Sequence, residues 1–158
     1  MPGQFVYASA QCVNLGTNIP VIQSCAGTTI SAWVNFTNVA PATFYHIGAM
    51  SIGGSPGSTN SRISLQLFPS AQLSLTGRST DGEAGHIMNS ASGAVIANTW
   101  YHLVGVNDLA ADTQAIYVNA VLNTSDPAAG FAAATTAATA VSCAALGAQD
   151  PANADYMN

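Results

Sequence analysis

Apolar and polar residues alternate along much of the chain at the two-residue period of a β-strand. Between Thr29 and Phe36 the even-numbered positions are apolar, and the odd-numbered positions are polar apart from Trp33. Residues 98–107 (NTWYHLVGVN) give the strongest strand signal, with Trp100, His102, Val104 and Val106 on one side and Tyr101, Leu103 and Gly105 on the other. Because successive strand side chains point to opposite faces, both segments predict strands with two distinct faces.

Further short segments rich in Val, Ile, Thr, Tyr and Phe are bounded by Gly, Pro, Asn and Ser. The expected strands are 5–14, 43–50, 62–68, 71–77, 114–119, 121–124 and 141–147, with loops at 53–61, 78–86 and 108–113. The alanine-rich stretch 128–145 favours helix by propensity, but its threonines and its strand neighbours predict a loop with at most one helical turn. Many short, closely spaced strands predict an all-β fold of two antiparallel sheets, with little or no helix.

Composition sets limits on the partners. Charged residues make up 6% of the 158 residues, against about 25% in an ordinary domain. There is no lysine, and Arg62 and Arg78 face seven carboxylates, for a net charge of -5. Nucleic-acid and anionic-membrane binding both need clustered cations, so neither is expected. The length suits one domain, 1–158, and the N-terminus lacks the features of a secretory signal.

Three segments, in this order, resemble the laminin-G-like branch of the concanavalin-A-like lectin/glucanase jelly rolls. They are TISAWVNF (29–36), NTWYHLVGVND (98–108) and QAIYVNAVL (114–122). The resemblance implies a two-sheet jelly-roll sandwich. Two departures stand out. Ala120 occupies a turn position where the family has Gly, so we expect a turn other than type I′. The family also has a further strand where this chain stops, at 154–158, so we expect a truncated domain or an edge covered by another chain.

The most concentrated polar chemistry lies in the loop 78–86, and Arg78, Asp81, Glu83 and His86 form the candidate ligand site. We expect no catalytic residues. The hydrolases of this fold carry a Glu-x-Asp-x-x-Glu strand motif, which is absent here. No Gly-x-Ser-x-Gly nucleophile elbow occurs either.

No metal site is expected, because no two histidines have helical metal-ligand spacing. Calcium is the one cofactor to consider, because laminin-G-like domains often hold it at a rim. The candidate carboxylate pairs are Asp81 with Glu83, Asp108 with Asp112, and Asp150 with Asp155. None has the dense spacing of a dedicated calcium loop, so ordinary turn acids are the preferred interpretation.

Two other residue types leave alternatives open. Cys12 and Cys25 are close enough in sequence to close a disulfide loop, but three buried thiols, with Cys143, are the favoured interpretation. For the mid-strand Trp33 and Trp100, we expect places in the core rather than in a sugar-stacking surface.

These features predict a non-enzymatic binding or surface-display module. The favoured hypothesis is a virion protein, such as a phage capsid or tail decoration protein in a homo- or hetero-oligomeric assembly, because poorly charged surfaces tend to associate. The alternative is a carbohydrate-binding module, excised from a larger extracellular protein, with a glycan as its partner. A glycoside-acting enzyme is disfavoured by the shortage of carboxylate pairs.

Overall fold

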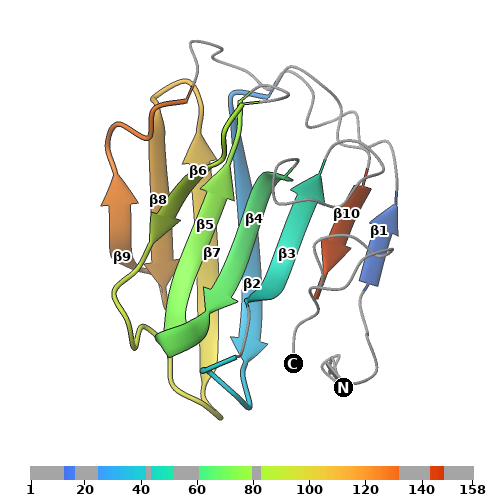
Figure 1. Ribbon diagram of the computed structural model, residues 1–158, viewed down its shortest axis with the longest axis vertical. Coiled ribbons are helices and arrows are strands. Elements are labelled where there is room, and N and C mark those ends of the chain that lie inside the picture. Colours follow the sequence, from blue (N-terminus) through green and yellow to red (C-terminus); the bar gives the residue numbers. More distant parts are fainter. Residues whose placement is uncertain are drawn as a thin grey trace.

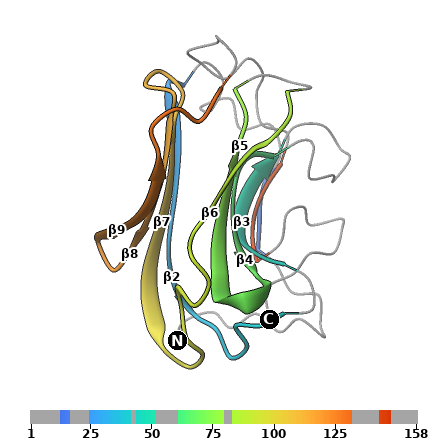
Figure 2. The same ribbon diagram turned by 60° about the vertical axis from the view of Figure 1, so that its left-hand side comes forward.

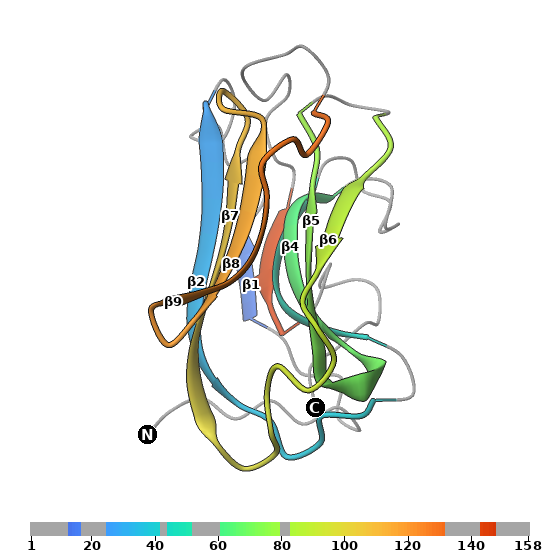
Figure 3. The ribbon, with the colours of Figure 1, turned by 90° about the vertical axis from the view of Figure 1, so that its left-hand side faces the viewer.

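The protein folds into two antiparallel β-sheets packed face to face. The computed structural model describes residues 13–16, 25–41, 44–51, 61–79, 83–131 and 143–147. Figures 1, 2 and 3 show the two layers, and in Figures 2 and 3 the strands β2, β7, β8 and β9 form the left-hand layer. The sequence prediction of an all-β sandwich is confirmed.

The strand order in each sheet follows from antiparallel pairing. The larger sheet runs β1 (Val13–Gly16), β10 (Cys143–Leu146), β3 (Tyr45–Ser51), β4 (Ser61–Phe68), β5 (Gln72–Gly77) and β6 (His86–Asn89). The smaller sheet runs β2 (Gly27–Asn35), β7 (Trp100–Asp108), β8 (Thr113–Val118) and β9 (Val121–Asp126).

Most sequence-predicted strands lie within a few residues of the observed ones. Within the described ranges there is no α-helix, and the only helical turn is the 3₁₀ segment Pro69–Ala71, which joins β4 to β5. The short strand β6 was not predicted. Of the predicted strand 5–14 only the end is described, and most of the alanine-rich stretch, together with residues 148–158, lies outside the described ranges. No helix in the described part is long and apolar enough to cross a membrane.

The core between the sheets comes from the alternating positions that the sequence indicates. From the larger sheet, Leu65, Leu67, Leu73 and Leu75 are completely buried. They meet side chains of the smaller sheet, namely Ile30, Val34, Leu103 and Ile116. Burying one such side chain contributes about 1.5–3 kcal/mol, so this layer supplies the main stabilising term.

Gly105 explains how β7 approaches the opposite sheet. A Cβ atom at this position would lie 2.7 Å from Cδ1 of Leu75 and 3.4 Å from Cδ1 of Leu65. The glycine therefore leaves room for two leucines of the larger sheet to pack against β7.

The hairpin between β8 and β9 differs from the sequence prediction. Val118 pairs with Val121 across a two-residue turn, and both turn residues have positive φ, 51° at Asn119 and 65° at Ala120. Positive φ at both central residues is the type I′ pattern, so the expectation of another turn type was wrong. Asn119 secures the turn, because its Oδ1 accepts a hydrogen bond of 2.9 Å from the backbone N–H of His102.

A second, smaller apolar cluster closes one end of the sandwich. Leu109 and Phe131 are buried there, with Cys25 and Ala129 packed against them. Cys25 is half-buried. Cys12 lies outside the described residues, so the choice between a disulfide and buried thiols stays a prediction.

Candidate functional site

The loop between β5 and β6 brings together the described members of the predicted ligand site. Arg78 Nε donates to the backbone carbonyl of Glu83 at 2.9 Å. Glu83 Oε2 accepts two hydrogen bonds from Ser79, from the backbone N–H at 2.6 Å and from the hydroxyl at 2.8 Å. Its other oxygen, Oε1, lies 2.9 Å from Nε2 of His86. A carboxylate only accepts, so this histidine nitrogen carries the proton. Asp81 lies outside the described residues.

These contacts use most of the described polar groups of the loop within the protein itself, so few of them can meet a ligand. Arg78 and Ser79 are buried, and the Glu83 side chain is only 9% exposed. The His86 ring is 22% exposed and packs edge-on against Phe131, with ring centroids 5.1 Å apart. Glu83 therefore stabilises its own loop, and the edge of His86 is the part of the described cluster best placed to meet another molecule.

The other acids of this end of the sandwich also hold turns. Asp108 Oδ1 accepts from the N–H of Ala111 at 2.9 Å. The same kind of bond, again to Oδ1, joins Asp126 to Ala128 at 3.0 Å and Asp112 to Phe131 at 2.8 Å. Within the described ranges, no group of three or more His, Cys, Asp or Glu side chains could hold a metal ion. The calcium pairs that involve Asp81, Asp150 or Asp155 fall outside those ranges.

The outer face of the smaller sheet is the most distinctive surface of the described structure. Trp33 on β2 is 67% exposed and Trp100 on β7 is 50% exposed. The prediction that both tryptophans belong to the core was wrong. Their strands alternate as predicted, but the inner positions are taken by Ile30, Val34 and Leu103. The indoles therefore point away from the core.

Four rings share this outer surface, which we call the aromatic face: Trp33, Trp100, His102 and Tyr117. The strand register places them together, since Trp33 pairs with His102 and Asn35 with Trp100. Tyr117 follows on β8, where it pairs with Val104. Trp33 and Trp100 are thus diagonal neighbours on adjacent strands, a relation that brings Cα atoms within about 7–8 Å and large side chains within reach of each other.

Two contacts on this face fix the orientation of the Trp33 and His102 rings. Trp33 stacks on His102 with centroids 5.2 Å apart and an interplanar angle of 28°, within the usual range for offset stacking. The His102 ring is held in turn by Ser31, whose Oγ lies 2.9 Å from Nε2. Trp33 and His102 are therefore oriented before any ligand arrives.

The aromatic face continues onto β9 as an apolar surface. Leu122 pairs with Tyr117 and is 52% exposed. Val121 is 69% exposed but pairs with Val118, so it belongs to the other side of the sheet. The four strands of this sheet contain no Lys or Arg, and their only acids are Asp108 and Asp126 at strand ends. Contiguous exposed apolar surface rimmed by polar groups marks an interaction site more often than scattered single residues do.

A cluster of polar side chains around His46 lies on the outward face of the larger sheet, but these side chains are buried. His46 is completely buried and its Nδ1 lies 2.8 Å from Oγ of Ser64. Gln66 Nε2 lies 3.1 Å from the other ring nitrogen. Burial lowers the pKa of His46 from 6.5 to about 3, so the ring is neutral at ordinary pH. Ser74 Oγ has no hydrogen-bond partner among the described residues.

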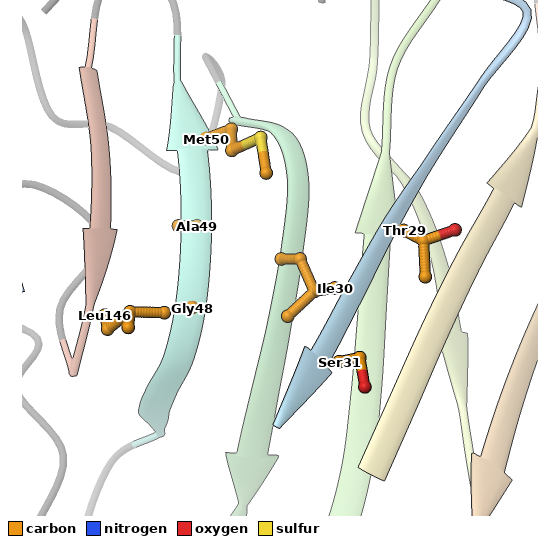
Figure 4. Close-up of a pocket in the computed structure, with 7 residues that line it drawn as sticks. All are labelled: Thr29, Ile30, Ser31, Gly48, Ala49, Met50 and Leu146. Atoms are coloured by element: carbon orange, nitrogen blue, oxygen red, sulfur yellow. The ribbon is translucent and has the colours of Figure 1, made fainter. Parts of the chain in front are cut away.

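A cavity of about 170 Å³ opens where β2 faces β3 and β10. It is lined by Thr29, Ile30, Ser31, Gly48, Ala49, Met50 and Leu146. Figure 4 shows Ile30 reaching from β2 toward the side of the cavity that carries Met50 and Leu146. None of these residues carries a titratable side chain, so the cavity supplies room for a small group and no acid–base chemistry.

Comparison with known proteins identifies the family to which this architecture belongs. Residues 9–158 match a laminin G family described as the Concanavalin A-like lectin/glucanases superfamily. No curated protein matches the sequence.

Among solved structures, the chain is similar to the CBM40 domain of the Ruminococcus gnavus IT-sialidase, with a TM-score of 0.63 and 13% identity over 93% of this chain and 83% of that one. It is also similar to NanB sialidase from Streptococcus pneumoniae, with a TM-score of 0.65 and 16% identity over 94% of this chain and 23% of that one. For the leech intramolecular trans-sialidase the TM-score is 0.64, with 12% identity over 92% and 23%. At these identities the likeness concerns the fold. The chain belongs to the concanavalin A-like lectin/glucanase superfamily.

Proposed function

We propose that this domain binds carbohydrate without catalysing a reaction on it, and that the sugar lies on the aromatic face. The observation that carries the proposal is the exposure of Trp33 and Trp100, 67% and 50%, on adjacent strands of one sheet. Exposed indoles leave apolar area in water, and covering that area stabilises a complex at about 25 cal/mol per Å².

The chemistry of the face suits a sugar ring. A pyranose has an apolar side of C–H groups and a rim of hydroxyls. Its weakly positive C–H groups complement the negative face of an indole ring. Ser31, Asn35 and His102 lie beside the indoles in the strand register, and their side chains both donate and accept, as sugar hydroxyls do.

The comparisons support the carbohydrate-binding alternative from the sequence more than the virion hypothesis. The fold is that of a lectin-like superfamily, and the CBM40 domain with the same architecture has been solved with α2,3-sialyllactose bound. A place on a virion and assembly into an oligomer have no comparable support and stay predictions of the sequence.

The absence of catalysis is supported by how the described acids are used. A retaining glycosidase needs two carboxylates about 5–5.5 Å apart on either side of the substrate. Glu83 is hydrogen-bonded within its own loop, and Asp108, Asp112 and Asp126 each accept a backbone N–H at a turn. Hydrogen bonds of this kind support a structural role for these acids, in which they stabilise turns and loops.

Isothermal titration against soluble β-glucan, galactomannan, xyloglucan and lactose tests the proposal. We expect Trp33→Ala and Trp100→Ala each to weaken binding at least about tenfold, which corresponds to about 1.4 kcal/mol. Ile87→Ala is the matched control, because Ile87 is equally exposed, at 59%, but lies on β6 of the other sheet. His86→Ala tests the alternative site in the loop 78–86, whose described residues lie at the end of β7 away from Trp100. Loss of binding in His86→Ala but not in Trp33→Ala would move the site to the loop and contradict the proposal.

A further inference from the structure

The positions of the cations restrict which sugars the aromatic face can hold. The sequence contains two side chains that are always positive, Arg62 and Arg78, and no lysine. Arg62 belongs to β4 and Arg78 directly follows β5, so both belong to the larger sheet. Arg78 is also buried, with Nε on the Glu83 carbonyl. The smaller sheet therefore carries the aromatic face without either cation.

An acidic sugar needs what this face lacks. The carboxylate of a sialic or uronic acid loses hydration when it is bound, and an arginine or lysine usually compensates through charge-assisted hydrogen bonds. Here the charged groups of the four strands are Asp108 and Asp126, and the whole chain carries a net charge of -5. An anionic ligand would lose hydration here without a compensating cationic partner.

A neutral sugar meets the opposite situation. The polar side chains of the aromatic face are hydroxyls, an amide and an imidazole, from Ser31, Asn35, Tyr117 and His102. Each can pair with a hydroxyl whichever way the hydroxyl proton points. Because it is stacked on His102, the Trp33 indole adds a fixed apolar platform, which lowers the entropy lost on binding.

We infer that the aromatic face selects neutral saccharides and rejects acidic ones. The inference rests on the proposed function and narrows it to a substrate class. It also separates this chain from the CBM40 domain with the same fold, which has been solved with α2,3- and α2,6-sialyllactose bound. On this inference, the shared architecture binds a different class of sugar in this chain, because its aromatic face has no cation.

A glycan array with matched pairs tests the inference. The array carries neutral gluco-, manno-, xylo- and galacto-oligosaccharides, including lactose and N-acetyllactosamine chains beside their α2,3- and α2,6-sialylated and sulfated forms. We expect signal on neutral members, and at least a tenfold drop when a sialic acid or sulfate is added to a bound glycan. For a bound neutral glycan, affinity should change less than about twofold between 50 and 500 mM salt, because screening acts on charged pairs.

Two variants test whether the array signal comes from the aromatic face. Trp33→Ala should lose the neutral signals and Ile87→Ala should keep them, with circular dichroism used to confirm that both variants fold. Equal or stronger signal on sialylated or sulfated members would overturn the inference while leaving carbohydrate binding intact. Signal on no glycan at all would overturn the proposed function and the inference with it.

Discussion

Replacing Glu83 with alanine should destabilise the protein far more than replacing another acid of the same end. The Glu83 side chain is 9% exposed, and its carboxylate accepts two bonds from Ser79 and one from His86. A hydrogen bond to a charged group contributes about 1.5–3 kcal/mol. Counting the two Ser79 bonds, and subtracting the desolvation that the buried carboxylate no longer suffers, gives a loss of about 3 kcal/mol. For a chain of this size that corresponds to a melting temperature lower by about 6 to 12 °C.

Urea denaturation followed by circular dichroism measures this loss, with an unchanged m-value as the sign that stability alone has changed. Asp108→Ala is the matched control, because its carboxylate makes one bond in an open turn, and we expect a loss of at most about 1 kcal/mol. Glu83→Gln keeps an oxygen for Ser79 but removes the charge, so it should fall between the two. Equal losses in Glu83→Ala and Asp108→Ala would refute the structural role of this carboxylate.

Three further predictions concern stability. His46 has a pKa lowered to about 3 by burial, so the unfolded chain takes up a proton near pH 6.5 while the native state does not. The free energy of unfolding should therefore fall as pH drops from 6.5 towards 3, by up to about 1.4 kcal/mol per pH unit. His46→Gln should flatten this part of the pH profile measured by urea denaturation. Ala120 has φ of 65°, so Ala120→Gly should raise the unfolding free energy by about 1 kcal/mol; an unchanged melting temperature would contradict the turn geometry. Gly105→Ala should lower stability by about 1–3 kcal/mol because its Cβ meets Leu75, and calorimetry showing no loss would mean that the sheets are not packed as described.

The sequence predicts the two-faced strands well, because period-two alternation is set by strand geometry alone. Which face is buried was harder to decide. In β7 both sides carry large apolar groups, and the decisive feature is Gly105, whose missing side chain admits Leu75 from the opposite sheet. In β2 the polar neighbours of Trp33, namely Ser31 and Asn35, already indicate an outward position, but the mid-strand position of Trp33 favoured the core.

The loop chemistry was predictable in part. Sequence proximity places Arg78, Glu83 and His86 in one loop, and in the structure Arg78 and His86 each contact Glu83. What proximity cannot indicate is that Ser79 donates two hydrogen bonds to the Glu83 carboxylate. These bonds make a candidate ligand group into a group that stabilises its own loop. The strand β6 was missed because four residues, His86–Asn89, are too few for a periodic signal.

A two-dimensional ¹H–¹⁵N spectrum of the indole N–H groups during a saccharide titration tests the central claim most directly. The sequence contains two tryptophans, so the spectrum holds two such signals, one from Trp33 and one from Trp100. If a neutral oligosaccharide stacks on the aromatic face, both signals shift and saturate together, with the affinity found by calorimetry. A saccharide that binds while both indole signals stay in place, with changes confined to the backbone around His86, would contradict the account.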